Sequence, residues 1–189
     1  MQESSVADLH ADLLGLCYPP ESIREVRLHH VFEHFPRPIA CALLASWYSW
    51  LQPGGGIHIE VPDFRRTALA MLNPLASLHR LAVGERHLFG SHEAAWAVHC
   101  EGYSPRLLKA MLESYGFTAK TMRKNAWRGT YNFEIIAHKP LQARTPADFE
   151  GVTRSFLTNF LVDDSEQRLL EVWMEMYRGQ LERSRARHA

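Results

Sequence analysis

Histidine and glutamate side chains gather at the end of an apolar, β-branched run in this sequence. Residues 25–32 read as a short buried strand that contains His29 and His30, and Glu33 and His34 follow directly. An imidazole has an ordinary pKa of about 6.5, so it exchanges protons near neutral pH. His30 and Glu33 are therefore candidates for acid–base catalysis. His29, the neighbour of His30 in a strand, is expected to point to the opposite face of the sheet.

The same residues match a metal-binding pattern. His30, Glu33 and His34 fit H-x-x-E-H, the inverted zinc-peptidase motif. That site requires both histidines on one face of a helix. The preceding residues have strand character, and Pro36 and Pro38 would interrupt a helix almost at once. A zinc hydrolase is therefore the least favoured interpretation, and we expect no metal ligands and no stoichiometric zinc.

The elements that position these side chains form a strand–helix–strand unit. Residues 39–51 carry apolar side chains at helical spacing, directly after two prolines that suit a first helical turn. The Pro-Gly-Gly-Gly segment at 53–56 is predicted to end the helix, and residues 57–61 alternate between apolar and polar as in a strand. Such units are right-handed crossovers in parallel sheets, and ligands bind beyond the carboxyl ends of the strands. The histidine cluster and Asp63 lie at those ends.

The remainder of the chain supplies further helices and a strand pair. The patterns predict a helix over residues 63–81 with an interruption at Asn73-Pro74, and then a loop over 84–102. A helix is expected from Ser104-Pro105, followed by two strands near 117–122 and 131–138 and by two helices after residue 145. The five tryptophans are interpreted mainly as core residues.

Five segments, in the right order, carry a resemblance to a known family, among them HHVFEHF, LQPGGGIHIEVPD, LFG and VHCEGYSPRLLKAMLESYGF. They resemble class I methyltransferases that use S-adenosylmethionine, of the type 11-like group, over roughly residues 11–139. The resemblance implies an α/β fold with a mostly parallel sheet of strand order 3-2-1-4-5-7-6. We therefore expect a partial Rossmann-like methyltransferase sheet over residues 1–140 and a helical C-terminal extension over 145–189.

The resemblance also assigns roles to individual residues. His99 matches a family histidine that precedes an aromatic residue and a helix, so it is the first candidate for a catalytic base, with His30 and Glu33 next. Asp12 falls at the end of the family's third strand, where an acidic residue accepts a hydrogen bond from the adenine amine of the cofactor. His29 and His30 are the other residues expected to bind the cofactor.

The family's glycine-rich turn and its acidic ribose-binding residue have no counterpart in this sequence, where Gly15 is the sole glycine before residue 50. We expect this chain alone to bind S-adenosylmethionine weakly. The strand at 25–32 is expected at a sheet edge that pairs with another copy or a partner chain. Two functions follow: a methyltransferase for a small-molecule or sugar acceptor, completed by another chain, or a non-catalytic methyltransferase-like module that acts by association.

Composition excludes some broad classes of function. The 189 residues include 21 basic and 21 acidic side chains, and this zero net charge argues against general nucleic-acid binding. The three cysteines lack metal-binding spacing and indicate a reduced, cytoplasmic protein. No apolar stretch is long enough for a membrane span, and the N-terminal residues lack the features of a signal peptide.

Overall fold

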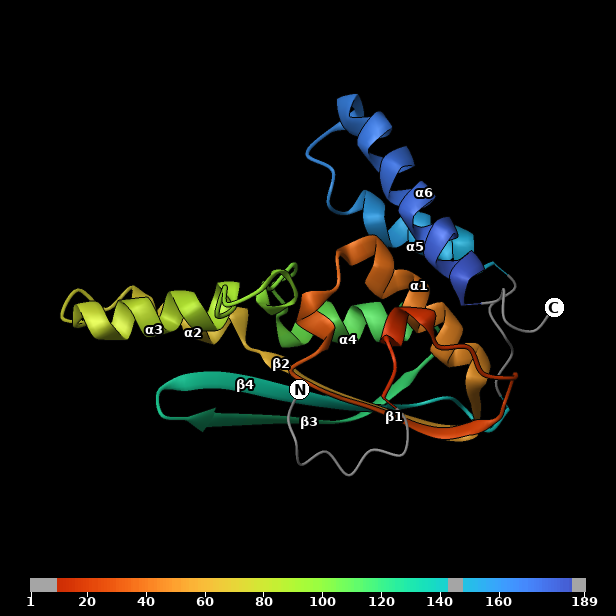
Figure 1. The fold of residues 1–189 in the computed structure, drawn as a ribbon, viewed down its shortest axis with the longest axis horizontal. Helices are drawn as coiled ribbons and strands as arrows, with labels where there is room; N and C mark the ends of the chain where they lie inside the picture. The colour runs from red at the N-terminus through yellow and green to blue at the C-terminus, as the bar shows by residue number, and fades with distance from the viewer. Residues whose placement is uncertain (1–9, 143–147, 185–189) are drawn as a thin grey trace.

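The computed structural model describes residues 10–142 and 148–184, which form a four-stranded sheet flanked by helices (Figure 1). In chain order the strands and α-helices are β1 (Ile23–His29), α1 (Arg37–Trp50), β2 (Leu51–Pro62), α2 (Phe64–Met71), α3 (Leu78–Phe89), α4 (Pro105–Ser114), β3 (Thr118–Trp127), β4 (Thr130–His138), α5 (Phe149–Thr158) and α6 (Gln167–Arg183). Helices α1 and α4 lie on one face of the sheet, and α5 and α6 lie above α1.

The strand order agrees with the one that the resemblance implies. The sheet runs β1-β2-β4-β3, with β1 and β2 parallel and β4 antiparallel to both of its neighbours. This is the order expected for strands 4, 5, 7 and 6 of the methyltransferase sheet. The predicted parallel unit and the predicted antiparallel pair are both confirmed, and the carboxyl ends of β1 and β2 meet at one edge.

The core forms between α1 and the sheet. Pro36 and Pro38 begin the helix, and its buried side chains include Leu43, Leu44 and Trp47. They pack with the inward residues of β2 and β4, such as Ile59. Because α1 is buried on nearly every side, its apolar residues hold the layers together.

Two predicted boundaries near the sheet are wrong. The strand expected over residues 25–32 ends at His29, because His30 adopts the left-handed conformation with a φ of 53°. The glycine segment expected as a turn lies inside β2, which begins directly after α1 at Leu51. There Gly54, with a φ of 81°, donates a backbone hydrogen bond to Lys139, so the segment continues the sheet.

The predicted helix over 63–81 is interrupted as expected, but the loop expected from residue 84 begins later. Helix α2 ends at Met71, and α3 starts after Ser77, whose side chain accepts a hydrogen bond from the backbone N–H of Arg80. Helix α3 continues to Phe89 and ends at Gly90, which has a φ of 91°. These two helices extend away from the core alongside β4 (Figure 1).

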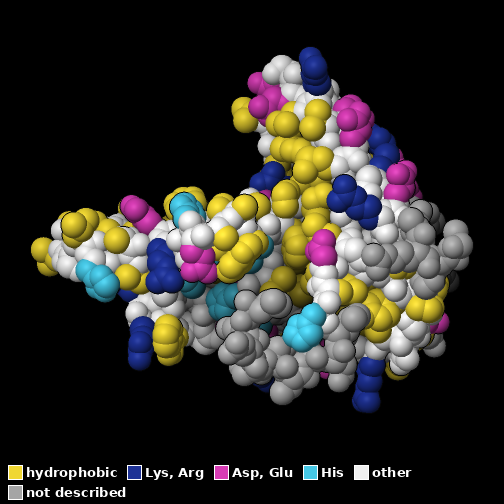
Figure 2. All heavy atoms as spheres, in the orientation of Figure 1, with side chains coloured by type: hydrophobic (Ala, Val, Ile, Leu, Met, Phe, Trp, Pro, Cys, Tyr) yellow, Lys and Arg dark blue, Asp and Glu magenta, His cyan; other side chains and the backbone are white. Residues whose placement is uncertain are grey.

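The two faces of the sheet differ in polarity. The face under the helices is apolar, whereas the other face carries cross-strand ion pairs such as His58–Glu25 and His58–Glu134, both at 3.7 Å. Apolar side chains are also exposed along the α2–α3 arm, where Leu72, Leu75 and Leu78 lie open to solvent (Figure 2).

The described part of the C-terminal extension packs against its own chain. Leu170, Met174 and Tyr177 of α6 are buried against α1 and α5, so much of the apolar stripe of α6 is already covered. Association of the chain therefore stays a prediction that depends on the outer edge of β1 more than on α6. Within residues 10–142 and 148–184, no helix is both long enough and apolar enough to cross a membrane.

Replacing Leu44 tests the assignment of the core to α1. Leu44 is fully buried, so Leu44→Ala should lower the free energy of unfolding by about 2–5 kcal/mol, as measured by urea denaturation. Leu75→Ala is the matched control, because its side chain is 90% exposed and its loss should change stability by less than about 0.5 kcal/mol. Equal effects of the two substitutions would contradict this core.

Candidate functional site

A cavity of about 770 Å³ opens at the carboxyl ends of β1 and β2. Its walls come from the segment after β1, from α3 and the loop that follows it, and from the β3–β4 hairpin. The lining side chains that can bind or react are His29, His30, His34, Glu60, His87, Trp96, His99, Asn125, Trp127 and Asn132. Five histidines therefore face one cavity, at the sheet edge where the sequence placed the site.

The short 3₁₀ turn η2 (Phe32–His34) fixes the inner end of this cavity. Phe32 is buried and stacks on Tyr103 with ring centroids 5.2 Å apart. The backbone carbonyl of Glu33 accepts hydrogen bonds from the N–H groups of Cys100 and Glu101, at 2.8 and 3.1 Å. These contacts bring the loop with His99 against the end of β1, although the two segments are far apart in sequence.

Glu33 and His30 form a carboxylate–imidazole pair. The Glu33 side chain is 1% exposed, and His30 Nδ1 donates to its Oε1 over 3.3 Å. This hydrogen bond raises the pKa of His30 above 6.5, while burial acts in the opposite direction. The bond to Nδ1 leaves His30 Nε2 directed toward Glu60 Oε1, 3.9 Å away. The pair has the arrangement of a base oriented by a carboxylate.

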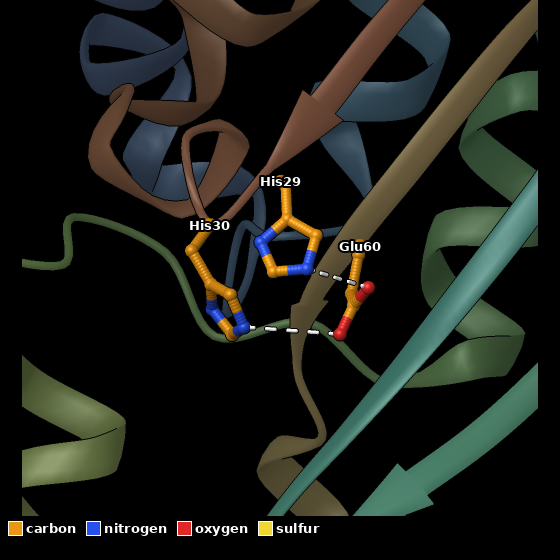
Figure 3. A group of neighbouring side chains, drawn as sticks. All are labelled: His29, His30 and Glu60. Atoms are coloured by element: carbon orange, nitrogen blue, oxygen red, sulfur yellow. Dashed lines mark ion pairs between the residues drawn. The ribbon is translucent and has the colours of Figure 1, made fainter. Parts of the chain in front are cut away.

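His29 and His30 approach the same carboxylate, which corrects the expectation that they face opposite sides of the sheet (Figure 3). His29 lies opposite Glu60 in the strand register, and its Nε2 is 3.0 Å from Glu60 Oε2. The left-handed backbone at His30 turns the second ring back toward Glu60. A non-glycine residue rarely adopts this conformation, and such strain is common at functional sites.

His34, His87 and His99 are each anchored by a backbone carbonyl. His34 Nδ1 donates to Val98 O at 3.0 Å, His99 Nδ1 to Leu88 O at 3.2 Å, and His87 Nε2 to Tyr131 O at 2.9 Å. Burial lowers the pKa of His87 and of His99 below 6.5, so both rings are neutral near pH 7. In neutral His99, whose Nδ1 donates to Leu88, the lone pair lies on Nε2.

The inverted zinc-peptidase arrangement does not form. His30 follows a strand and His34 ends a three-residue 3₁₀ turn, so the two rings do not share a helical face. The structure instead groups His34 with Glu33 and His99, whose potential ligand atoms lie within 4.8 Å of one another. Sequence spacing could not reveal this group, because His99 comes from a distant loop.

The remaining predicted site residues lie outside the cavity lining. Asp12 is exposed, and its Oδ1 accepts a hydrogen bond from the N–H of Leu14 at the start of the 3₁₀ turn η1 (Leu13–Gly15). Asp63 is buried and caps α2 through a hydrogen bond from the N–H of Arg66. The role of Asp12 at the cofactor is therefore still a prediction, and Asp63 has a structural role at the end of β2.

Sequence reasoning named no site role for Trp127, Glu60, Asn125 or Asn132, which line the cavity. Trp96 and Trp127 line it with 70% and 65% of their surface exposed, whereas the sequence interpretation favoured core packing. Glu60 and His87 also line it. The polar positions of the alternating β2 pattern indicated Glu60, and both His87 and Trp96 fall within the loop expected over residues 84–102.

Comparisons with known proteins give matches at the level of structure alone. No family model and no curated protein matches the sequence. Among solved structures, a S-adenosylmethionine-dependent methyltransferase from Methanosarcina mazei is similar with a TM-score of 0.48 and 16% identity, over 69% of this chain and 66% of that one. The 1,6-didemethyltoxoflavin-N1-methyltransferase of Burkholderia thailandensis, solved with S-adenosylhomocysteine, matches with a TM-score of 0.48 and 14% identity, over 67% of this chain and 48% of that one.

The chain thus spans about two thirds of the first of these proteins and about half of the second. The strand order of its own sheet carries the fold assignment. The order of the four strands is the one expected for strands 4, 5, 7 and 6 of the sheet that the resemblance implies. In such sheets the carboxyl ends of the strands face the ligands, and here they open into the histidine cavity.

Histidine NMR tests the electrostatics of the cavity. His30 should titrate above pH 6.5, and His87 and His99 below it. Glu33→Gln removes the charge and the strong acceptor on His30, so the pKa of His30 should fall. Because the pKa of His30 is raised in the folded state, the His30–Glu33 pair stabilises the fold fully below about pH 6.5. This stabilisation is lost as pH rises through the folded-state pKa of His30. A His30 pKa below that of His99 in the native chain would contradict this geometry.

Proposed function

We propose that this chain is the acceptor-binding part of a methyltransferase that uses S-adenosylmethionine and acts on a small-molecule or sugar acceptor. The observation that carries the proposal is the pair of His30 and buried Glu33 at the wall of a histidine-rich cavity, at the carboxyl edge of a methyltransferase-type sheet. The three cysteines are unpaired, which is consistent with the cytoplasmic location that we propose.

His30 would serve as the general base. Its Nδ1–H is held by Glu33, so Nε2 is the atom that would take a proton from an acceptor hydroxyl or amine in the cavity. The raised pKa of His30 makes it the stronger base, while the lowered pKa of His99 keeps that ring neutral. His99, the first candidate from the resemblance, is the second candidate for the base.

The exposed tryptophans support an acceptor with a flat or ring-shaped apolar surface. Trp96 and Trp127 come from different segments and both line the cavity, which also offers Asn125 and Asn132. Aromatic faces beside amide and imidazole groups suit a sugar ring, because such a ring has apolar C–H faces and polar hydroxyl edges.

The described residues fit the cofactor in part. S-adenosylmethionine, when bound, supplies an electrophilic methyl group. His29, His30 and Asp12 are the residues of this chain proposed to contact it. In the part of the chain that the structure describes, no glycine-rich turn precedes β1 that could approach the methionine carboxylate. We therefore propose that another chain supplies these contacts by pairing along the outer edge of β1.

A second candidate function is a non-catalytic module that acts by association. The outer edge of β1 favours it, since β1 pairs only with β2 among the described strands and its other backbone groups are available to a partner strand. The two functions differ in whether the cavity performs chemistry.

Methyl transfer at high cofactor concentration separates these functions. The isolated chain should bind S-adenosylmethionine with a millimolar or weaker dissociation constant in titration calorimetry, because it supplies few of the contacts. At millimolar radiolabelled cofactor, we expect slow methylation of at least one compound in a panel of monosaccharides, sugar nucleotides and phenols.

His30→Gln should lower that rate about 100-fold, the usual contribution of a general base. His138→Gln is the control, because His138 lies at the opposite end of β2 from the cavity. Equal rates in wild type and His30→Gln would remove His30 from the reaction. No product with any acceptor would favour the association module, and a micromolar dissociation constant would show that the chain holds the cofactor unaided.

A further inference from the structure

We propose that Glu33, His34 and His99 bind a divalent transition-metal ion of the zinc type at the wall of the cavity. Their potential ligand atoms lie within 4.8 Å of one another. Two imidazoles and one carboxylate are ligands that zinc and related ions prefer. The sequence predicted no metal site, and the proposal arises because the fold brings His99 to the two adjacent residues of η2.

Both histidines are prepared as ligands through their Nε2 atoms. The Nδ1–H of His34 donates to the carbonyl of Val98, and the Nδ1–H of His99 donates to the carbonyl of Leu88. In metal sites the second ring nitrogen of a ligating histidine is usually held in this way, which fixes the tautomer and the direction of the ring.

Glu33 has an oxygen without a partner in a buried position. Oε1 faces His30 Nδ1 at 3.3 Å and His99 Nε2 at 4.0 Å, whereas Oε2 is buried and has no hydrogen-bond partner among the described residues. A buried carboxylate oxygen left unpaired is costly, because it has lost its hydration without compensation. A cation bound to the Glu33 carboxylate would compensate its buried charge.

The separations within this group suit a metal better than direct hydrogen bonds. The His99–Glu33 distance of 4.0 Å is too long for a hydrogen bond. Zinc binds nitrogen and oxygen at about 2.0–2.2 Å, which places neighbouring ligand atoms roughly 3.3 Å apart in a tetrahedron. A small inward movement of the side chains would close the site. His34 and His99 line the cavity, so a fourth position would be open to a bound molecule.

A neighbouring group, His29, His30 and Glu60, meets the same distance criterion but is satisfied without a metal. His29 Nε2 pairs directly with Glu60 Oε2 at 3.0 Å (Figure 3). Glu60 Oε1 also accepts a hydrogen bond from Asn125 at 2.8 Å. The side chain of His29 is also 69% exposed. This group is best described as a surface ion pair, so we assign the metal to the buried group.

Such a metal would act on the acceptor. An oxygen of the acceptor at the open position would be polarised, which lowers the pKa of its hydroxyl and eases loss of the proton to His30. This consequence rests on the proposed function, but metal binding itself does not. It can be measured without S-adenosylmethionine and without any acceptor.

Metal titration of the untagged, chelator-treated chain tests the site. We expect one Zn²⁺ per chain in titration calorimetry, and one Co²⁺ per chain with the visible absorption of a cobalt ion bound by nitrogen and oxygen. His34→Gln and His99→Gln should each weaken Zn²⁺ binding about 100-fold, because loss of a residue that only supports a metal ligand already weakens binding about 10- to 100-fold. Glu33→Gln should do the same where circular dichroism shows that it folds.

Two matched controls make the result decisive. His29→Gln removes a ligand of the neighbouring group, and His138→Gln removes a histidine at the far end of the sheet. Both variants should bind Zn²⁺ as the native chain does. The proposal would be overturned by absence of stoichiometric binding in the native chain, by native affinity in His99→Gln or His34→Gln, or by loss of binding in His29→Gln.

Discussion

The buried carboxylate of Glu33 is the constraint on which the arrangement of the cavity depends. The backbone carbonyl of Glu33 accepts hydrogen bonds from the N–H groups of Cys100 and Glu101, which join η2 to that segment. The side chain of Glu33 faces His30 and His99. A carboxylate with 1% exposure must be matched by polar neighbours, because burial of an unpaired charge is strongly unfavourable. The histidines around it are therefore part of the fold as well as candidates for chemistry.

The sheet explains why this carboxylate lies beside a cavity. Parallel β1 and β2 end at the same edge, and the antiparallel β3–β4 hairpin closes the cavity from the other side. Helix α1 covers one face and holds the strands through its buried side chains. In the described sheet β1 and β3 are the edge strands, so the outer backbone groups of each have no described strand beside them. The edge proposed for association therefore lies beside the cavity proposed for chemistry.

Patterns of local sequence predicted the strand–helix–strand unit, and the resemblance predicted the order of the four strands. Local patterns could not predict the left-handed turn at His30, because a non-glycine residue rarely adopts this conformation and strand periodicity carries no signal for it. They also could not place His99 beside Glu33, since backbone hydrogen bonds between distant segments make that contact. Trp96 lies in a short 3₁₀ turn after α3 and Trp127 ends β3, so distant segments place both exposed rings at the cavity.

The central claim is that the histidine cavity at the ends of β1 and β2 faces the cofactor and acceptor of a methyl transfer. Ring NMR signals of the histidines, followed during titration with S-adenosylhomocysteine to millimolar concentration, test it most directly. Concentration-dependent shifts of His29 and His30 are expected, with His138 at the opposite end of the sheet unchanged. Unchanged signals for all five cavity histidines, or shifts confined to His138, would contradict it.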